Sequence, residues 1–250
     1  MREIFTRIED NTSVNIEVET DLEDFNDTHP WLLSVFIKFV KTNEDDNYYS
    51  FLETKESLII ALEMQGAAHY AGTREVDGWS ELYFYARNSK DLDTTVAKQL
   101  KDTPYIYESN VVKDAKWGFY NKQLLPTDLE FCHIESAKII FLLEEEGDTL
   151  ETEREVEFYA VFDTPTQKER FIDKALDIGY VYKDDLSTEE YPYGVAMTKH
   201  QSVLYETITP VVTEFFTMLE TERAHYEGWS TVLISDQDEN DEGDEQDEEE

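Results

Sequence analysis

VEFYAVF at residues 156–162 and TPTQ at residues 164–167 decide the fold of the C-terminal half. The first stretch is rich in aromatic and β-branched residues, which predicts a strand. In the second, Thr164 suits a helix N-cap, Pro165 suits the first helical position, and Gln167 completes a capping box. The helix that follows is expected to stop near Gly179, and its apolar stripe consists of Phe171, Ile172, Ala175 and Leu176.

The rest of this half continues the alternation of strands and helices. Residues 180–183 and 194–199 predict two further strands, and residues 226–234 predict a last one. Between them lies a helix with apolar residues at helical spacing: Ile208, Val211, Val212, Phe215, Phe216 and Leu219. The resulting β-α-β-β-α-β order is the ferredoxin-like pattern.

The N-terminal half repeats this order after a short hairpin. The hairpin is expected at 4–8 and 14–18, and later strands at 33–40, 68–74, 79–87, 105–112 and 118–124. Helices are expected at 49–65, 92–100 and 127–146, and Thr127 with Glu130 forms a capping box for the last. We therefore predict an α+β protein with two ferredoxin-like α/β sandwich domains and antiparallel sheets. The domains are placed at 1–147 and 155–235, joined by an acidic linker at 147–153.

Two short segments of the halves are similar. Ala68-His69-Tyr70 and Asp77-Gly78-Trp79-Ser80 together resemble the single run Ala224-His225-Tyr226-Glu227-Gly228-Trp229-Ser230. The similarity is consistent with an old duplication or with chance, because the spacing within the two copies differs.

Charge excludes several classes of function. The 250 residues include 58 acidic and 21 basic ones, a net charge of −37 at pH 7. Surfaces that bind nucleic-acid phosphates or anionic lipid are rich in Lys and Arg, so direct binding of nucleic acid or of a membrane is not expected. Residues 236–250 carry 11 acids and no base, which predicts a disordered tail. Such a tail serves for solubility, or as a decoy that attracts a basic partner.

No pattern of catalytic or ligand-binding residues stands out. The chain has no nucleophile elbow, no Walker loop and no dinucleotide-binding glycine pattern. Cys132 lies among apolar residues and is expected in the core. The five histidines do not have the spacing of metal ligands on one element. We therefore predict no catalytic residue, no cofactor and no metal site from these patterns. Without a targeting segment or a long apolar run, a cytoplasmic location is expected.

The aromatic strand at 79–87 is a candidate contact surface. Alternation places Trp79, Tyr83 and Tyr85 on one face. The opposite face, with Leu82, Phe84 and Ala86, is expected to meet the helices. The Trp/Tyr face is the one that a ferredoxin-like sheet leaves open, so it is expected to pack against the other half's sheet or to meet a protein partner.

Residues 155–234 resemble the RraB family, the protein inhibitors of ribonuclease E. The likeness rests on the 156–162 strand with its helix ending at Gly179-Tyr180, on the amphipathic last helix, and on Tyr226-Glu227-Gly228-Trp229-Ser230. The last run is similar to the family's Tyr-Asp-Gly-Trp-Glu. The N-terminal half resembles an uncharacterised domain family often fused before such a domain, through Gly72-Thr73-Arg74 and the run from Trp79 to Tyr85.

The resemblance implies a non-catalytic protein that binds and modulates a ribonuclease or another RNA-processing enzyme. The candidate partner-binding residues are Tyr226, Glu227, Gly228, Trp229, Trp79, Tyr83 and Tyr85. For Trp229 a second interpretation is a packed indole beside a bulge at Gly228. The alternative functions are a small-ligand sensor that binds at the interface of the two domains, and an enzyme without a recognisable motif. The sequence leaves the oligomeric state open.

Overall fold

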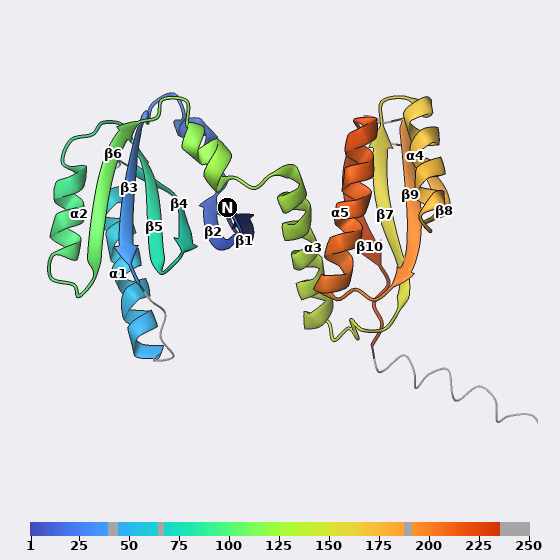
Figure 1. The fold of residues 1–250 in the computed structure, drawn as a ribbon, viewed down its shortest axis with the longest axis horizontal. Helices are drawn as coiled ribbons and strands as arrows, with labels where there is room; N and C mark the ends of the chain where they lie inside the picture. Colours follow the sequence, from blue (N-terminus) through green and yellow to red (C-terminus); the bar gives the residue numbers. More distant parts are fainter. Residues whose placement is uncertain (40–44, 65–67, 188–191, 236–250) are drawn as a thin grey trace, which may run out of the picture. The chain divides into compact units, whose positions relative to one another are not determined.

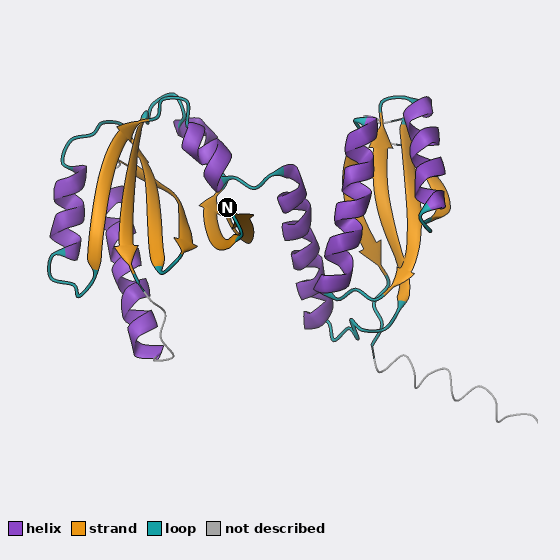
Figure 2. Cartoon of the chain, viewed as in Figure 1, coloured by secondary structure: helices purple, strands orange, loops and turns teal. Residues whose placement is uncertain are grey.

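The computed structural model describes residues 1–39, 45–64, 68–187 and 192–235. It divides into two compact units, Met1–Pro126 and Thr127–Glu250 (Figure 1). Each unit combines an antiparallel sheet with helices (Figure 2), which confirms the predicted α+β class with two domains. The predicted tail, residues 236–250, lies outside the described residues. None of the helices in the described part of the chain is long and apolar enough to cross a membrane.

The N-terminal unit is a ferredoxin-like motif extended by a hairpin. Its elements are β1 (Arg2–Glu9), β2 (Thr12–Glu19), β3 (Trp31–Lys38), α1 (Asp45–Glu63), β4 (Ala68–Val76), β5 (Trp79–Ala86), α2 (Leu92–Leu100) and β6 (Ile106–Lys113), with short helical turns η1 (Glu23–Phe25) and η2 (Tyr120–Leu124). The sheet order is β1-β2-β4-β5-β3-β6. The elements from β3 to β6 form the ferredoxin-like motif, and its first strand (β3) and third strand (β5) are central, as in other sheets of this type. The β1–β2 hairpin extends the sheet beyond β4.

Alternation along β5 divides its residues between two cores. Leu82, Phe84 and Ala86 pack with apolar residues of α1 and α2, as predicted. On the opposite face Tyr83 and Tyr85 are buried with residues of β2 and of the segment after β6. The sheet of this unit therefore has a core on each side.

The segment after β6 differs from its prediction. Residues 118–124 were expected to form a strand, but they form a helical turn that ends in η2. Asp114 starts the turn, because its carboxylate accepts hydrogen bonds from the backbone N–H groups of Gly118 (2.8 Å) and Phe119 (2.9 Å). Trp117, with φ of 52°, reverses the chain and stacks on Tyr85 at 3.7 Å between ring centroids. These aromatic residues cover the second face of the sheet.

The C-terminal unit has the ferredoxin-like order with one added helix. Its elements are α3 (Asp128–Glu145), β7 (Arg154–Phe162), α4 (Pro165–Asp177), β8 (Val181–Leu186), β9 (Tyr193–Gln201), α5 (Tyr205–Glu222) and β10 (His225–Thr231). The sheet order is β10-β7-β9-β8, with the first and third strands of the motif in the centre. Helices α4 and α5 pack against each other and over the sheet, and their apolar faces form one core with β7 and β9.

Helix α3 corrects the predicted domain boundary. The capping box at Thr127 and Glu130 is present, so the start of the helix was predicted correctly. The helix packs against α5 and β10, and Ile140 joins their core. The first domain therefore ends at Pro126. The predicted limit at residue 147 wrongly assigned helix α3 to the first domain. The second domain likewise begins before residue 155.

The segment predicted as a linker is held inside the C-terminal unit. The carboxylate of Asp148 pairs with Arg154 at 2.6 Å, and both side chains are buried. Arg154 also donates to the carbonyl oxygen of Val232 (3.1 Å), and the N–H of Ile234 donates to Asp148 (2.8 Å). The buried ion pair thus fixes the chain just before β7 to the chain just after β10.

Candidate functional site

The run from Tyr226 to Ser230 contains a β-bulge. The register between β10 and β7 shifts between Tyr226 and Gly228, which leaves Glu227 as an extra residue. Residues three apart in a regular strand point to opposite faces. The bulge lets Tyr226 and Trp229 both pack against the core. Gly228 adopts φ of +108°, a conformation that side chains with a Cβ rarely adopt.

Trp229 connects β10 to α3. Its indole is 4% exposed, and its Nε1–H donates to Ser136 Oγ at 3.0 Å. The Ser136 hydroxyl in turn donates to the carbonyl oxygen of Cys132 at 2.8 Å. This confirms the interpretation of Trp229 as a packed indole beside a bulge. The partner-binding role of this run stays a prediction, and Glu227 is its exposed member.

Tyr226 and Cys132 lie in the same contact between α3 and the core. The Tyr226 ring is 5.8 Å from that of Phe215, and its hydroxyl is buried without a hydrogen-bond partner in the described structure. Burial raises the pKa of Cys132 to about 11 and also raises the pKa of Tyr226. Both groups therefore stay protonated at neutral pH, and Cys132 is an unreactive residue packed against the core, as predicted.

The sheet face opposite the helices carries a polar network in the C-terminal unit. Lys183 Nζ bridges Glu155 (2.6 Å) and Glu157 (2.7 Å). The Tyr159 hydroxyl contacts Glu157 (3.1 Å) and Ser230 (2.6 Å). The hydrogen bond from Lys183 is the main reason that the pKa of Glu157 is lowered. Carboxylates thus outnumber the single lysine in this network.

The predicted residues of β5 occupy different environments. Tyr83 and Tyr85 are buried beneath Phe119 and Trp117 of their own unit. The expectation that these two rings meet the other half's sheet or a partner is therefore wrong. Trp79 is partly exposed, and Lys38 Nζ lies 5.9 Å from the centre of its ring. Its role as a partner-binding residue stays a prediction.

A histidine pair lies at the other end of the N-terminal sheet. The rings of His29 and His69 are 4.8 Å apart, and Phe25 stacks on His69 at 3.8 Å. Arg87 Nε lies 3.3 Å from His29 Nε2. Burial is the largest cause of a lowered pKa in both histidines, and Arg87 adds to it. Both rings are therefore neutral at pH 7.

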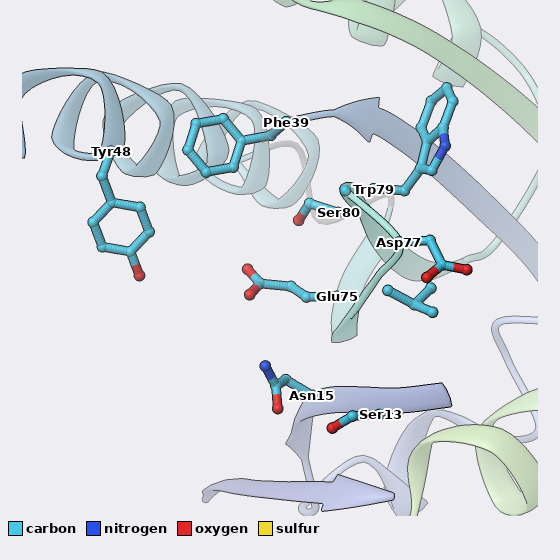
Figure 3. Close-up of a pocket in the computed structure, with 10 residues that line it drawn as sticks. Ser13, Asn15, Phe39, Tyr48, Glu75, Asp77, Trp79 and Ser80 are labelled. Atoms are coloured by element: carbon cyan, nitrogen blue, oxygen red, sulfur yellow. The ribbon is translucent and has the colours of Figure 1, made fainter. Parts of the chain in front are cut away.

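A cavity of about 400 Å³ opens beside α1 in the N-terminal unit. Its floor is a row of three cross-strand neighbours, because Asn15 pairs with Glu75 and Glu75 pairs with Ser80. Phe39 and Tyr48 line the opposite side, whereas the Trp79 indole points away (Figure 3). An adjoining cavity of about 320 Å³ shares Asn15, Tyr48 and Glu75. Sequence reasoning missed this site.

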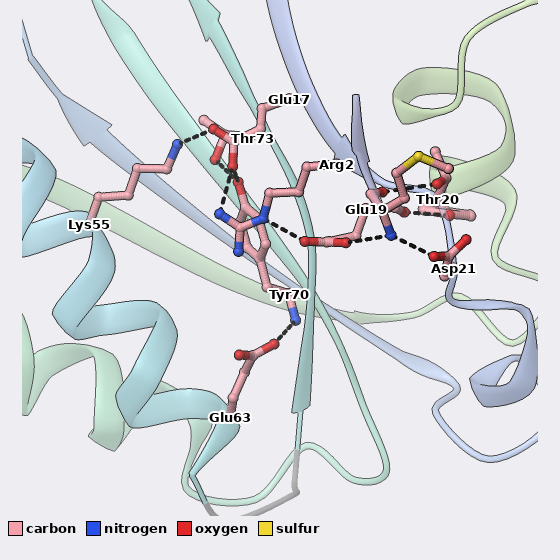
Figure 4. A network of polar contacts seen from close by, with 11 residues as sticks. Arg2, Glu17, Glu19, Thr20, Asp21, Lys55, Glu63, Tyr70 and Thr73 are labelled. Carbon is pink, nitrogen blue, oxygen red and sulfur yellow. Dashed lines mark hydrogen bonds and ion pairs between the residues drawn. The ribbon is translucent and has the colours of Figure 1, made fainter. Parts of the chain in front are cut away.

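The adjoining cavity is lined by an ion-pair network (Figure 4). Glu17 accepts from Lys55 Nζ (3.0 Å) and from the Tyr70 hydroxyl (2.9 Å). Burial opposes ionisation of Glu17, but Lys55, Tyr70 and Arg2 together lower its pKa. Gly72 lets β4 approach β2 here, since a Cβ would lie 2.5 Å from the Glu17 carbonyl oxygen. This explains the glycine of the quoted Gly72-Thr73-Arg74 run.

The two similar segments share a local structure but not a position. Both β4 and β10 carry a bulge in an Ala-His-Tyr-x-Gly run, between Tyr70 and Gly72 and between Tyr226 and Gly228. However, β4 is the second strand of its ferredoxin-like motif and β10 is the fourth strand of its own. The segments are therefore not equivalent strands of a duplicated domain.

Comparison with known proteins gives two family matches. Residues 133–231 match the family described as regulator of ribonuclease activity B, RraB. Residues 4–125 match a family of unknown function, DUF695. No curated protein matches the chain. In the described part of the chain, no group of three or more His, Cys, Asp or Glu side chains is arranged to hold a metal ion.

Two solved structures are similar at a low level. One is an unknown protein from Galdieria sulphuraria, with 9% identity and a TM-score of 0.21, over 82% of this chain and 99% of that chain. The other is a putative glycine cleavage system transcriptional repressor, with 11% identity and a TM-score of 0.24, over 82% and 97%. Neither likeness supports a conclusion about this chain. The two matches agree with the resemblances seen in the sequence motifs: the N-terminal half is similar to DUF695, and the C-terminal half is similar to RraB, the regulator of ribonuclease activity B.

Proposed function

We propose that this chain is a non-catalytic acidic protein that binds a ribonuclease, or another RNA-processing enzyme, and modulates its activity. The observation that carries the proposal is the RraB match over residues 133–231, which extends from α3 to the end of β10. The net charge of −37 supports a partner with basic surfaces. Enzymes that handle RNA need such surfaces to bind phosphate.

The charge of the C-terminal sheet supports protein binding rather than RNA binding. RNA-recognition domains of similar architecture stack bases on the open sheet face. Here that face presents Glu155 and Glu157 around Lys183. An uncompensated carboxylate repels phosphate and attracts Lys or Arg of a protein. The proposed contact is therefore made by the carboxylates of this face and by exposed Glu227, with Trp229 in a supporting role beneath.

Direct binding tests the proposal. The affinity of the purified chain for a purified ribonuclease of the same organism is measured at about 50 and about 200 mM salt. We expect saturable binding that weakens with salt. The double variant Glu155→Gln with Glu157→Gln is expected to bind about tenfold more weakly at low salt, because two charges at the contact are lost.

The matched control removes equal charge from the helical face. Glu169 and Asp173 are exposed on α4, so Glu169→Gln with Asp173→Asn changes net charge by the same amount. We expect this control to bind like the unmodified chain. Absence of binding to any ribonuclease tested would contradict the regulatory role. Equal weakening of both double variants would contradict the assignment to the sheet face.

A further inference from the structure

We propose that the cavity beside α1 in the N-terminal unit binds a small organic cation that carries an amine or a guanidinium group. This binding site would be a property of the DUF695 domain and is independent of ribonuclease regulation. Three features of the cavity define the ligand: a buried hydroxyl, a carboxylate that has no partner among the described residues, and two aromatic rings.

Ser80 supplies the buried hydroxyl. Its side chain is 2% exposed, and Oγ has no hydrogen-bond partner in the described structure. The Oγ atom points into the cavity between Phe39 and Glu75 (Figure 3). A buried polar group without a partner lowers stability. A ligand that exchanges a hydrogen bond with this hydroxyl removes that cost.

Glu75 supplies the charge. It is the neighbour of Ser80 across the β4–β5 pair, and its carboxylate makes no hydrogen bond or ion pair with the described residues. Asn15, on its other side, accepts a hydrogen bond from Thr6 Oγ1 at 2.9 Å through Oδ1. Its amide N–H groups therefore remain available to a ligand. Among the described residues, neither lysine nor arginine lines this cavity, so none of them offers a counter-charge to an anionic ligand.

In the adjoining cavity, a carboxylate of the same sheet is neutralised by basic side chains. Glu17 lies on the same face of β2 as Asn15 and is neutralised by Lys55 and Arg2. Glu75 lacks equivalent partners among the described residues. A ligand cation would neutralise the Glu75 carboxylate as Lys55 neutralises that of Glu17.

Phe39 and Tyr48 supply the aromatic wall. Their ring centroids are 6.2 Å apart, and Phe39 is fixed by stacking on Phe51 at 4.1 Å. The face of an aromatic ring attracts ammonium and guanidinium groups. A carboxylate opposite such a wall favours an organic cation over a metal ion, which would seek several oxygen ligands.

Calorimetric titration of the full chain with agmatine tests the site. Agmatine carries both a guanidinium and an ammonium group, and butyramide serves as a shorter, neutral amide control. At about 150 mM salt we expect one agmatine per chain, and no binding of butyramide. Glu75→Gln is expected to weaken agmatine binding about tenfold, because it removes a charge-assisted hydrogen bond.

Two further variants separate the site from general charge attraction. Glu108→Gln removes the same charge from an exposed position on β6 and is expected to leave the affinity unchanged. A chain ending at Ser235 is expected to keep the site although it lacks the acidic tail. Equal weakening by Glu75→Gln and Glu108→Gln, loss of binding without the tail, or no saturable binding would each overturn the proposal.

Ser80→Ala tests the buried hydroxyl. Because Oγ has no hydrogen-bond partner among the described residues, the ligand-free variant is expected to melt at the same temperature as the unmodified chain or higher. Its affinity for agmatine is expected to fall by a few fold. A variant that binds agmatine as tightly as the unmodified chain would refute the role of the hydroxyl in the site.

Discussion

The contact between Trp229 and Ser136 makes a specific prediction about stability. The indole is buried, and its N–H donates to Ser136 Oγ at 3.0 Å, so it holds α3 on the sheet. Trp229→Ala removes a large buried side chain and is expected to cost about 3–5 kcal/mol of the free energy of unfolding. Ser136→Ala leaves the indole N–H buried without an acceptor and is expected to cost about 1–3 kcal/mol.

A double-mutant cycle isolates the hydrogen bond itself. Trp229→Phe keeps an aromatic ring but removes the donor, and Ser136→Ala removes the acceptor. Each single variant loses the same hydrogen bond. The loss of unfolding free energy in the double variant is therefore expected to be smaller than the sum of the losses in the two single variants, by about 0.5–1.5 kcal/mol. Such amounts are a large fraction of the roughly 5–15 kcal/mol that stabilises a typical domain.

Urea unfolding of residues 127–250, followed by far-UV circular dichroism, measures these free energies. The fragment corresponds to the C-terminal unit. Costs that simply add in the double variant would show that the two side chains do not interact. A cost of less than about 1 kcal/mol for Trp229→Ala would refute burial of the indole. The result also matters for binding studies, because loss of partner binding in Trp229→Ala would report unfolding of the domain.

Three further predictions concern other features of the fold. Acidification below about pH 6.5 should lower the urea midpoint of the N-terminal unit more than it lowers that of His69→Phe. The pKa values of buried His29 and half-buried His69 are lowered in the folded state, so their contribution to stability is full above the unfolded pKa and is lost as pH falls through the folded values; an equal pH response of both proteins would count against it. Arg154→Met should cost about 3–5 kcal/mol in urea unfolding, because buried Asp148 loses its counter-charge; a loss under about 1 kcal/mol would argue that the pair is hydrated. Gly228→Ala should cost about 1–3 kcal/mol through its positive φ, and an unchanged thermal midpoint would show that the bulge relaxes.

Local patterns in the sequence predict much of this fold. Alternation at 79–87 identifies the face that meets α1 and α2, because a strand must present every second side chain to the same core. The capping box at Thr127 and the N-cap at Thr164 place the starts of α3 and α4 at Asp128 and Pro165, since these contacts lie within one turn of helix. The Gln167 side chain does not complete the predicted capping box, because it donates to the carbonyl oxygen of Glu222. Four strands and two helices in ferredoxin-like order then limit each sheet to few topologies.

The errors arise where distant contacts decide the structure. Residues 118–124 have aromatic content typical of a strand, but Asp114 caps a helical turn there and Trp117 stacks on Tyr85, which is far away in the sequence. Helix α3 belongs to the C-terminal unit because Ser136 contacts Trp229, and no local signal indicates this. The cavity depends on strand register, which brings Asn15, Glu75 and Ser80 into one row.

The regulatory role is tested most directly by the rate at which a purified ribonuclease of the same organism cleaves a fluorescent RNA. The rate is measured against increasing concentrations of the full chain, with poly-glutamate of equal total charge as a control for general polyanion effects. We expect the full chain to change the cleavage rate in a saturable way, and poly-glutamate to leave the rate unchanged. A chain ending at Ser235 is expected to have the same effect as the full chain. An unchanged rate at saturating chain, or an equal effect of poly-glutamate, would contradict it.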